Sequence, residues 1–271
     1  MVKDKFFVID AHCHVYPDKI ALKAVEGTSN FYDGINAAHD GRVSTLHEIG
    51  EKTGIDHFVV QSVAMSPKQV QSINNFIAET VADSNGKMTG LGTLHPDSAD
   101  ISGDIEHIIE LGLHGVKLHP DIQQFKIDDY RCLKIYELCE KKCLPILMHT
   151  GDYRYDFSNP NRLLPVMQIY TSLTVVGAHL GGWSVWDDAA EKLLGLDNLY
   201  FDCCSCMPYI DKNKVKELIR TFGAKRVLFG TDYPLWSPQK ELNEFLSMEL
   251  SDEENRLILS ENAKRIYKIH I

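Results

Sequence analysis

Short apolar runs alternate with longer amphipathic stretches, and this alternation is the main structural pattern of the sequence. Seven stretches with helical spacing separate eight runs rich in β-branched and large apolar residues. The runs predict buried strands near residues 6–11, 57–63, 88–94, 114–118, 145–148, 173–178, 198–203 and 226–231. Strands that alternate with helices predict βαβ units and a parallel sheet. Eight repeats favour a (β/α)8 TIM barrel over an open sheet, because the first strand ends in His-Cys-His rather than in a Gly-rich phosphate loop.

The length of 271 residues suits a single barrel, so we predict one domain over residues 1–271. Segments 15–43 and 150–162 are rich in Gly, Asn and Asp and are predicted to be long loops at the active rim. Residues 251–254, Ser-Asp-Glu-Glu, resemble a capping box that opens a helix in the C-terminal tail.

Composition and charge exclude several classes of function. Hydrophobic residues make up 44% of the chain and charged residues 24%, as in ordinary globular proteins. No run approaches the roughly 18 apolar residues that a membrane span needs, and the N-terminus does not resemble an export signal, so we expect a cytoplasmic protein. A net charge of −10 without a basic cluster disfavours nucleic acid as a partner and leaves a small molecule as the expected ligand.

The seven cysteines are predicted to be reduced thiols, because the count is odd and no export signal precedes them. Cys203, Cys204 and Cys206 lie close in sequence. Neighbouring residues of a strand point to opposite faces, so we interpret these cysteines as small buried residues rather than as joint metal ligands.

Imidazole and carboxylate groups follow five of the predicted strands. In a barrel the carboxyl ends of all strands meet at one rim, so groups about 220 positions apart can share one pocket. His12 and His14 lie two apart on a strand and project to the same face, an arrangement that can chelate a divalent cation such as zinc. The other groups are His119, His149, His179 and Asp232.

Each of these residues also has a structural interpretation. A single histidine at a strand end is often only a hydrogen-bonded structural group, and Asp232 could cap a helix. A buried carboxylate needs a cation or several donors, and several histidines reach the same rim. We therefore favour a metal site that includes Asp232.

The same residues carry a family resemblance. The chain resembles the amidohydrolase superfamily, in particular the branch that contains aminocarboxymuconate-semialdehyde decarboxylase, γ-resorcylate decarboxylase and several lactone hydrolases. The resemblance covers nearly the whole chain. It rests on the motifs IDAHCH, GVKLHP, MHTG, GAHLGG, GTDYP and ENAKRIY, in that order.

The resemblance implies metal ligation by His12, His14, His149 and Asp232, with proton transfer by His179 next to a metal-bound water. Asp232 is also implied in catalysis, since it can take the proton of that water. In binuclear relatives the histidine at the place of His179 binds a second metal.

A carboxylated lysine bridges the two metals in such relatives, and Lys117 lies close to its place. Because KLHP also occurs in mononuclear relatives, the number of metals stays open. His119 is expected to bind substrate or water alongside Lys117.

These ligands predict a metal-dependent hydrolase that uses a metal-bound water to cleave an amide, lactone or related bond. A non-oxidative decarboxylase of an aromatic or dienoic acid is the alternative on the same site, and a catalytically silent ligand-binding barrel is a third. We expect one zinc ion, or two, with manganese as another candidate. A homodimer is the default expectation for such barrels.

Substrate contacts are predicted on the loops after the fifth, sixth and eighth strands. Arg154 could bind a substrate carboxylate through its planar guanidinium, as could Arg162. Trp183, Trp186 and Trp236 could contact an apolar part of the substrate. The alternative is that these side chains only pack loops over helices.

Overall fold

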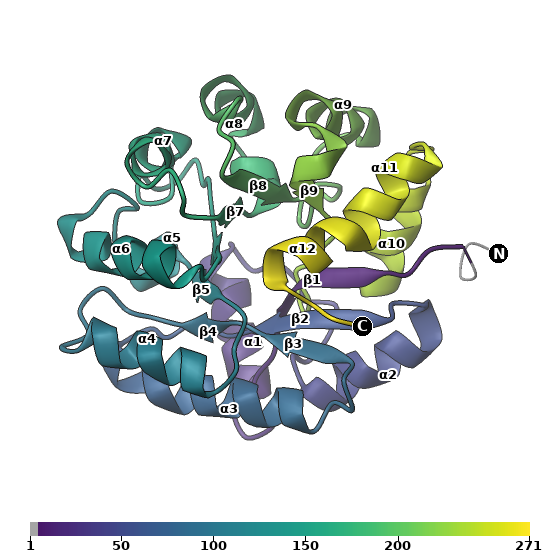
Figure 1. The fold of residues 1–271 in the computed structure, drawn as a ribbon. Helices are drawn as coiled ribbons and strands as arrows, with labels where there is room; N and C mark the ends of the chain where they lie inside the picture. Colours follow the sequence, from purple (N-terminus) through teal and green to yellow (C-terminus); the bar gives the residue numbers. More distant parts are fainter. Residues whose placement is uncertain (1–4) are drawn as a thin grey trace.

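Parallel strand segments alternate with helices throughout residues 5–271, which are the residues described by the computed structural model (Figure 1). Residues 1–4 of the predicted domain lie outside the described residues. The strands are β1 (Ile9–His14), β2 (His57–Gln61), β3 (Met88–Gly90), β4 (Gly92–Thr93), β5 (Val116–Leu118), β6 (Ile146–Met148), β7 (Val175–Gly177), β8 (Leu199–Asp202) and β9 (Val227–Leu228). Each predicted strand run therefore overlaps at least one observed strand, although β1 extends three residues beyond the predicted run 6–11.

The strands pair in sequence order, and every ladder is parallel. β3 and β4 are the two halves of the predicted third strand: the first half pairs with β2 and the second with β5. Backbone bonds from Ala11 N to Phe229 O and from Asp232 N to His12 O, both 2.9 Å, connect the last strand segment to β1. This arrangement confirms the predicted α/β fold of TIM-barrel type.

The helices surround the strands, as Figure 1 shows. They are α1 (Ala21–Phe31), α2 (Val43–Thr53), α3 (Val70–Ala82), α4 (Ile101–Glu110), α5 (Pro120–Gln123), α6 (Leu133–Lys142), α7 (Pro160–Ile169), α8 (Trp186–Leu193), α9 (Lys212–Phe222), α10 (Pro238–Leu246), α11 (Asp252–Arg256) and α12 (Asn262–Tyr267). Among the described residues, every helix is too short or too polar to traverse a lipid bilayer.

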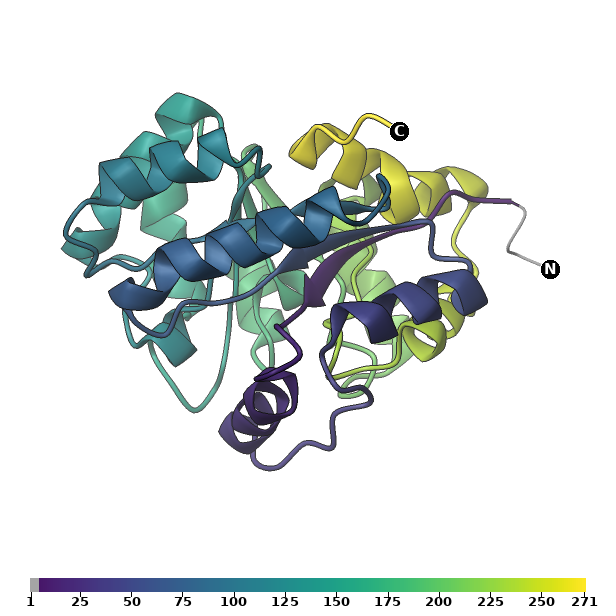
Figure 2. The same cartoon turned by 90° about the horizontal axis from the view of Figure 1, so that it is seen from below.

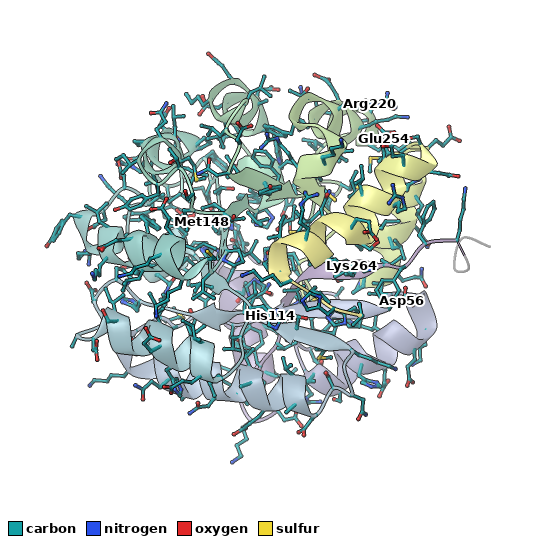
Figure 3. All side chains as sticks on the ribbon, viewed as in Figure 1. Asp56, His114, Met148, Arg220, Glu254 and Lys264 are labelled. Atoms are coloured by element: carbon teal, nitrogen blue, oxygen red, sulfur yellow. The ribbon has the colours of Figure 1, made fainter. Side chains whose placement is uncertain are left out.

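Local sequence explains where α11 begins. The predicted capping box is confirmed at the start of α11, where the Ser251 hydroxyl accepts from Glu254 N and the Glu254 carboxylate accepts from Ser251 N. Glu254 also lies beside Arg220 of α9, with 3.5 Å between Arg220 Nε and Glu254 Oε1 (Figure 3). The cap thus defines the start of α11, and the partly exposed ion pair is a contact between α11 and α9.

The barrel interior forms a hydrophobic core of its own, separate from the larger core between strands and helices. It contains inward-facing residues of the strands, such as Ile9, Val59 and Leu147, and residues of α12, such as Tyr267. The imidazole of His114 contacts Tyr267 O at 2.5 Å and anchors α12 there (Figure 3). α12 therefore closes one end of the barrel, and α1 lies at the opposite end (Figure 2).

The segment 15–43 differs from its prediction as a long loop, because it contains α1. No side chain caps α1, and its sequence includes Gly27, Thr28, Ser29 and Asn30, which are weak helix formers. Packing at the barrel mouth supplies what the local sequence lacks: Tyr32, which follows α1, is buried and bonds through its hydroxyl to His119 Nε2 at 2.9 Å.

Candidate metal centre

His12, His14 and Asp232 meet at the end of the barrel opposite α12. His12 Nε2 lies 3.2 Å from His14 Nε2 and 3.5 Å from Asp232 Oδ1, and His14 Nε2 lies 3.7 Å from the same oxygen. Four ligands placed tetrahedrally at about 2.1 Å from a zinc ion lie about 3.4 Å from one another. The three atoms therefore have the spacing of a metal coordination shell.

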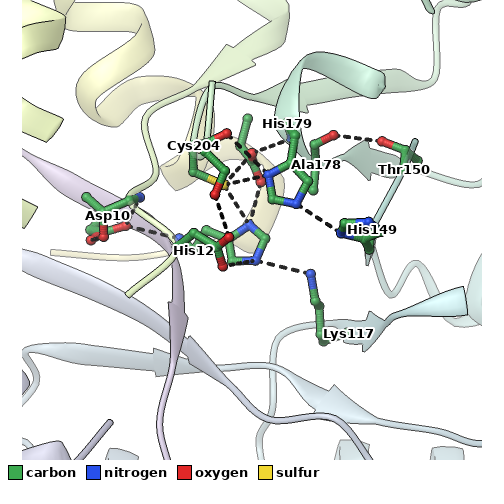
Figure 4. Close-up of polar contacts among 12 residues, drawn as sticks. Asp10, His12, Lys117, His149, Thr150, Ala178, His179 and Cys204 are labelled. Atoms are coloured by element: carbon green, nitrogen blue, oxygen red, sulfur yellow. Dashed lines mark hydrogen bonds and ion pairs between the residues drawn. The ribbon is translucent and has the colours of Figure 1, made fainter. Parts of the chain in front are cut away.

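Hydrogen bonds around His12 indicate which of its nitrogens is free for a metal. Figure 4 shows His12 among its polar neighbours, with Lys117 and Cys204 on either side. Asp202 Oδ2 lies 2.8 Å from His12 Nδ1, and both side chains are buried. A carboxylate accepts a hydrogen bond, so Nδ1 carries the proton and Nε2 presents a lone pair toward His14 and Asp232. Burial, followed by the nearby Lys117 and His12, lowers the pKa of His14 well below its usual value, so the His14 imidazole is neutral near pH 7. These donors fit a divalent cation.

A second pair of imidazoles lies beside this triangle. His149 Nδ1 and His179 Nε2 are 3.0 Å apart, while the other nitrogens face carbonyl oxygens: His149 Nε2 lies 3.0 Å from Gly151 O and His179 Nδ1 3.2 Å from Cys204 O. Since a carbonyl only accepts, the nitrogens that face it carry protons and the lone pairs of the two rings face each other. This arrangement requires a cation or a shared proton between or near the two rings.

Asp232 is ionised and oriented by its neighbours. Burial raises its pKa, but the imidazoles of His12, His179 and His14 outweigh burial and lower the pKa below the usual value. The Ser205 hydroxyl donates to Asp232 Oδ2 at 2.6 Å and accepts from Trp236 Nε1 at 2.8 Å. Oδ1 is therefore the oxygen that faces the histidines.

Backbone strain is concentrated at the same residues. Asp232, His179 and Ser205 have φ angles of 59°, 60° and 53°, in the left-handed region that few residues other than glycine adopt. Such conformations cost on the order of 1–3 kcal/mol each and persist where surrounding structure imposes them, commonly at functional sites. The strained backbone at these three residues therefore lowers the stability of the fold while it orients their side chains toward the candidate metal centre.

Lys117 and His119 also reach the cluster. Lys117 is fully buried, its Nζ lies 3.1 Å from His12 Nε2, and burial lowers the pKa of its amine. His119 stacks on His149 with ring centroids 3.9 Å apart. Both predicted residues thus lie next to the candidate ligands.

Sequence reasoning missed two residues of this site. Asp202, at the end of β8, accepts hydrogen bonds from His12 Nδ1 and from His179 N, the second at 2.8 Å. Cys204 is buried as predicted, yet its Sγ lies 3.2 Å from both His12 Nδ1 and His179 Nδ1 and donates to Asp202 at 2.9 Å. The available signal for Asp202 was a charged residue at the end of an apolar run, the same signal that identified Asp232.

A cavity of about 730 Å³ opens from the cluster. The side chains that line its base are those of the predicted site: His12, His14, Lys117, His119, His149, His179 and Asp232. Trp183 lies to one side, in a small pocket that also includes Asp232 and Tyr209. The structure thus brings the chemically active predicted residues to one place.

Arg154 requires a correction. Each nitrogen of its guanidinium donates within the protein: to the buried carboxylate of Asp152, to Phe31 O at 2.8 Å and to Asp33 at 3.0 Å. Arg154 does not line the cavity, so it connects α1 to the loop after β6 instead of offering a free carboxylate receptor. Arg162 is likewise paired, with Asp128 and Asp156.

Known proteins resemble this chain in sequence and in fold. A decarboxylase of Dictyostelium discoideum, named for 2-amino-3-carboxymuconate-6-semialdehyde, is 25% identical over 202 residues. That match covers 60% of this chain and spans only 56% of the Dictyostelium protein's length.

Solved structures share the fold. A TIM-barrel protein from Bordetella bronchiseptica superposes with a TM-score of 0.79 at 20% identity, covering 96% of this chain and 98% of that one. A dihydroxybenzoic acid decarboxylase from Polaromonas sp. JS666, determined with bound manganese and the inhibitor 2-nitroresorcinol, has a TM-score of 0.75 at 15% identity, with 97% of each chain covered. The sequence profile of the amidohydrolase family matches residues 9–269, nearly the whole chain. The chain therefore belongs to the amidohydrolase family of enzymes.

Proposed function

We propose that this protein is a metal-dependent, non-oxidative decarboxylase of an aromatic or dienoic acid. The sequence alone favoured hydrolysis and kept decarboxylation as the alternative. The relatives reverse that order, because both the Dictyostelium protein and the Polaromonas protein are named as decarboxylases.

The triangle of His12 Nε2, His14 Nε2 and Asp232 Oδ1 is the observation that supports the metal dependence of this reaction. These residues would bind one divalent cation, with His149 as the further ligand. The cation would act as a Lewis acid and polarise the oxygens of the substrate. Zinc was expected from the ligand set, whereas the Polaromonas relative contains manganese, so both ions are candidates. A second ion that involves His179 and Lys117 is the alternative.

Asp232 is the proposed proton carrier. The Asp232 carboxylate is ionised. With a hydroxybenzoate as substrate, Asp232 can take the proton of the substrate hydroxyl and pass it to the ring carbon that bears the substrate carboxylate. The bond from that carbon to the carboxylate then breaks, its electron pair returns to the ring, and carbon dioxide leaves. The remaining phenolate takes a proton from water, so one proton is consumed for each carbon dioxide released.

The other side chains bind and orient the substrate in this proposal. Burial lowers the pKa of His179 to about 4, so its imidazole is neutral near pH 7 and can accept or share a proton with His149. Lys117 and His119 face the cavity where they can contact substrate oxygens. Because these groups are buried, a carboxylate there loses most of its hydration, which favours a reaction that removes its charge.

Product analysis tests the proposal. Protein loaded with manganese or zinc is incubated with hydroxybenzoates, a dienoic acid and a panel of lactones and amides, in water labelled with ¹⁸O. We expect carbon dioxide and the decarboxylated product from at least one acid, without ¹⁸O in that product. Cleavage of lactones or amides with ¹⁸O incorporation, and no carbon dioxide from any acid, would show a hydrolase instead.

A further inference from the structure

The cavity extends well beyond the candidate metal centre. Its outer walls come from α1, from the segment 62–65 after β2, and from α3. Cavities of about 300–1,000 Å³ enclose drug-sized ligands. A volume of about 730 Å³ therefore leaves room for a substituent beside the reacting carboxylate and ring.

The walls of this outer part are largely apolar. Ala24 and Phe31 contribute from α1, and Ile73 and Phe76 contribute from α3. At the mouth, Ile20 and Met65 expose 51% and 65% of their surfaces, which is high for large apolar side chains. Isolated exposed apolar residues are common, but these two border the same cavity and continue its apolar wall.

Charged groups are scarce along this part of the cavity. Lys23 and Lys117 are the only lysine or arginine residues among the described residues that line it. Lys117 lies at the base against His12, and Lys23 is exposed at the rim. Arg154 does not contribute, since Asp152 and Asp33 occupy its guanidinium. A second carboxylate on the substrate would therefore meet no buried lysine or arginine of the described residues between the base and the rim of the cavity. Burying a carboxylate without such a partner is unfavourable in free energy.

We propose that the substrate is an aromatic acid with a single carboxylate and a long apolar substituent, such as an alkyl chain, that lies between α1 and α3. This inference rests on the proposed function, which places the carboxylate at the metal centre. It assigns α1 and α3 a role in selecting the substrate. Each methylene buried in the cavity is expected to raise affinity about fourfold.

A homologous series tests the inference. We would measure kcat/KM of the manganese-loaded protein for 2,6-dihydroxybenzoates with no substituent or with a methyl, propyl, pentyl or heptyl chain at position 4. A benzenedicarboxylate serves as the doubly charged competitor. Affinities are measured in parallel by calorimetry, so the apolar wall is tested whether or not carbon dioxide is released. Both kcat/KM and affinity should rise along the series.

Variants locate the effect on the cavity wall. Met65→Asp places a charge at the mouth, and the matched control Leu22→Asp changes an exposed residue of α1 that does not line the cavity. The preference for the heptyl acid over the unsubstituted acid should fall at least tenfold in Met65→Asp and stay within twofold in Leu22→Asp. Gly27→Phe is a steric second test, since a side chain added at this cavity-lining position meets no atom within 4 Å.

The outcomes separate the two proposals. Failure to release carbon dioxide from any acid, together with affinity that rises with chain length, contradicts the decarboxylase and supports the apolar wall. Equal or falling affinity along the series, or tighter binding of the dicarboxylate, overturns the inference while leaving the decarboxylase in place.

Discussion

Asp202 Oδ2 lies 2.8 Å from Nδ1 of His12, and Asp202 Oδ1 accepts from the backbone N–H of His179 at 2.8 Å. One buried carboxylate thus fixes the ring orientation of His12, a candidate metal ligand, and the turn that presents His179 to the cavity. Partners of this kind commonly change metal affinity about 10- to 100-fold when removed.

Asp202→Asn should therefore weaken metal binding about 10- to 100-fold, because an amide can present a donor to His12 and release its ring. Metal affinity is measured by competition with a fluorescent chelator. Asp197→Asn, at a 98% exposed side chain just before β8, is the matched control and should bind metal normally. Equal metal affinity in the two variants would show that Asp202 does not support metal binding.

His12→Ala and Asp232→Ala should each lower turnover by at least about 10²–10⁴-fold, since each removes a ligand and Asp232→Ala also removes the proton carrier. The measurement is kcat on the best acid found, with circular dichroism to confirm folding. His47→Ala, on the half-buried face of α2 and away from the cavity, is the control. Full activity in either site variant would mean that the assignment is wrong.

The ionisation of Glu241 in α10 should make the stability of the protein depend on pH. It is buried, its Oε2 lacks a hydrogen-bond partner, and burial raises its pKa from 4.5 to about 8. Between these values the folded protein retains a proton that the unfolded chain releases, so the free energy of unfolding falls as pH rises from about 4.5 to about 8.

Glu241→Gln should remove this dependence. The variant and the parent should have similar stability at pH 5, and the variant should be more stable at pH 8 by roughly 3 kcal/mol, because linkage assigns about that much free energy to such a pKa difference over this pH range. Urea denaturation at both pH values measures the difference, with exposed Glu253→Gln as the control. The same difference at pH 5 and pH 8 would show that Glu241 is not buried as a neutral acid.

Thiol titration tests the burial of the cysteines. Cys143 is exposed, whereas the other six are buried with raised pKa values, the first cause being burial. An Ellman reagent should therefore modify one thiol rapidly in the native protein and seven after denaturation, and Cys143→Ser should abolish the rapid phase. Rapid modification of more than one thiol would contradict the packing of the strand ends.

Much of the fold was predictable because short, continuous apolar runs differ from longer stretches with helical spacing. The runs at 145–148 and 173–178 are examples of the first kind. Each of these runs contains a strand, β6 and β7. α1 was not predictable, since its helical state depends on packing by residues such as Tyr32 rather than on its own propensity.

The convergence of His12, His14 and Asp232 followed from strand topology, but the partners of individual side chains did not. Pairing of Arg154 with Asp33 depends on the course of α1, and contact between Cys204 and the imidazoles depends on the turn after β8. The cytoplasmic location and the homodimer stay predictions.

Diffraction from crystals grown with zinc, with data at the metal absorption edge, tests the shared cation directly. We expect one strong anomalous peak per chain, about 2.0–2.2 Å from Nε2 of His12, Nε2 of His14 and a carboxylate oxygen of Asp232. A metal-replete crystal with no peak among these three atoms, or with its metal bound elsewhere on the chain, would contradict this expectation.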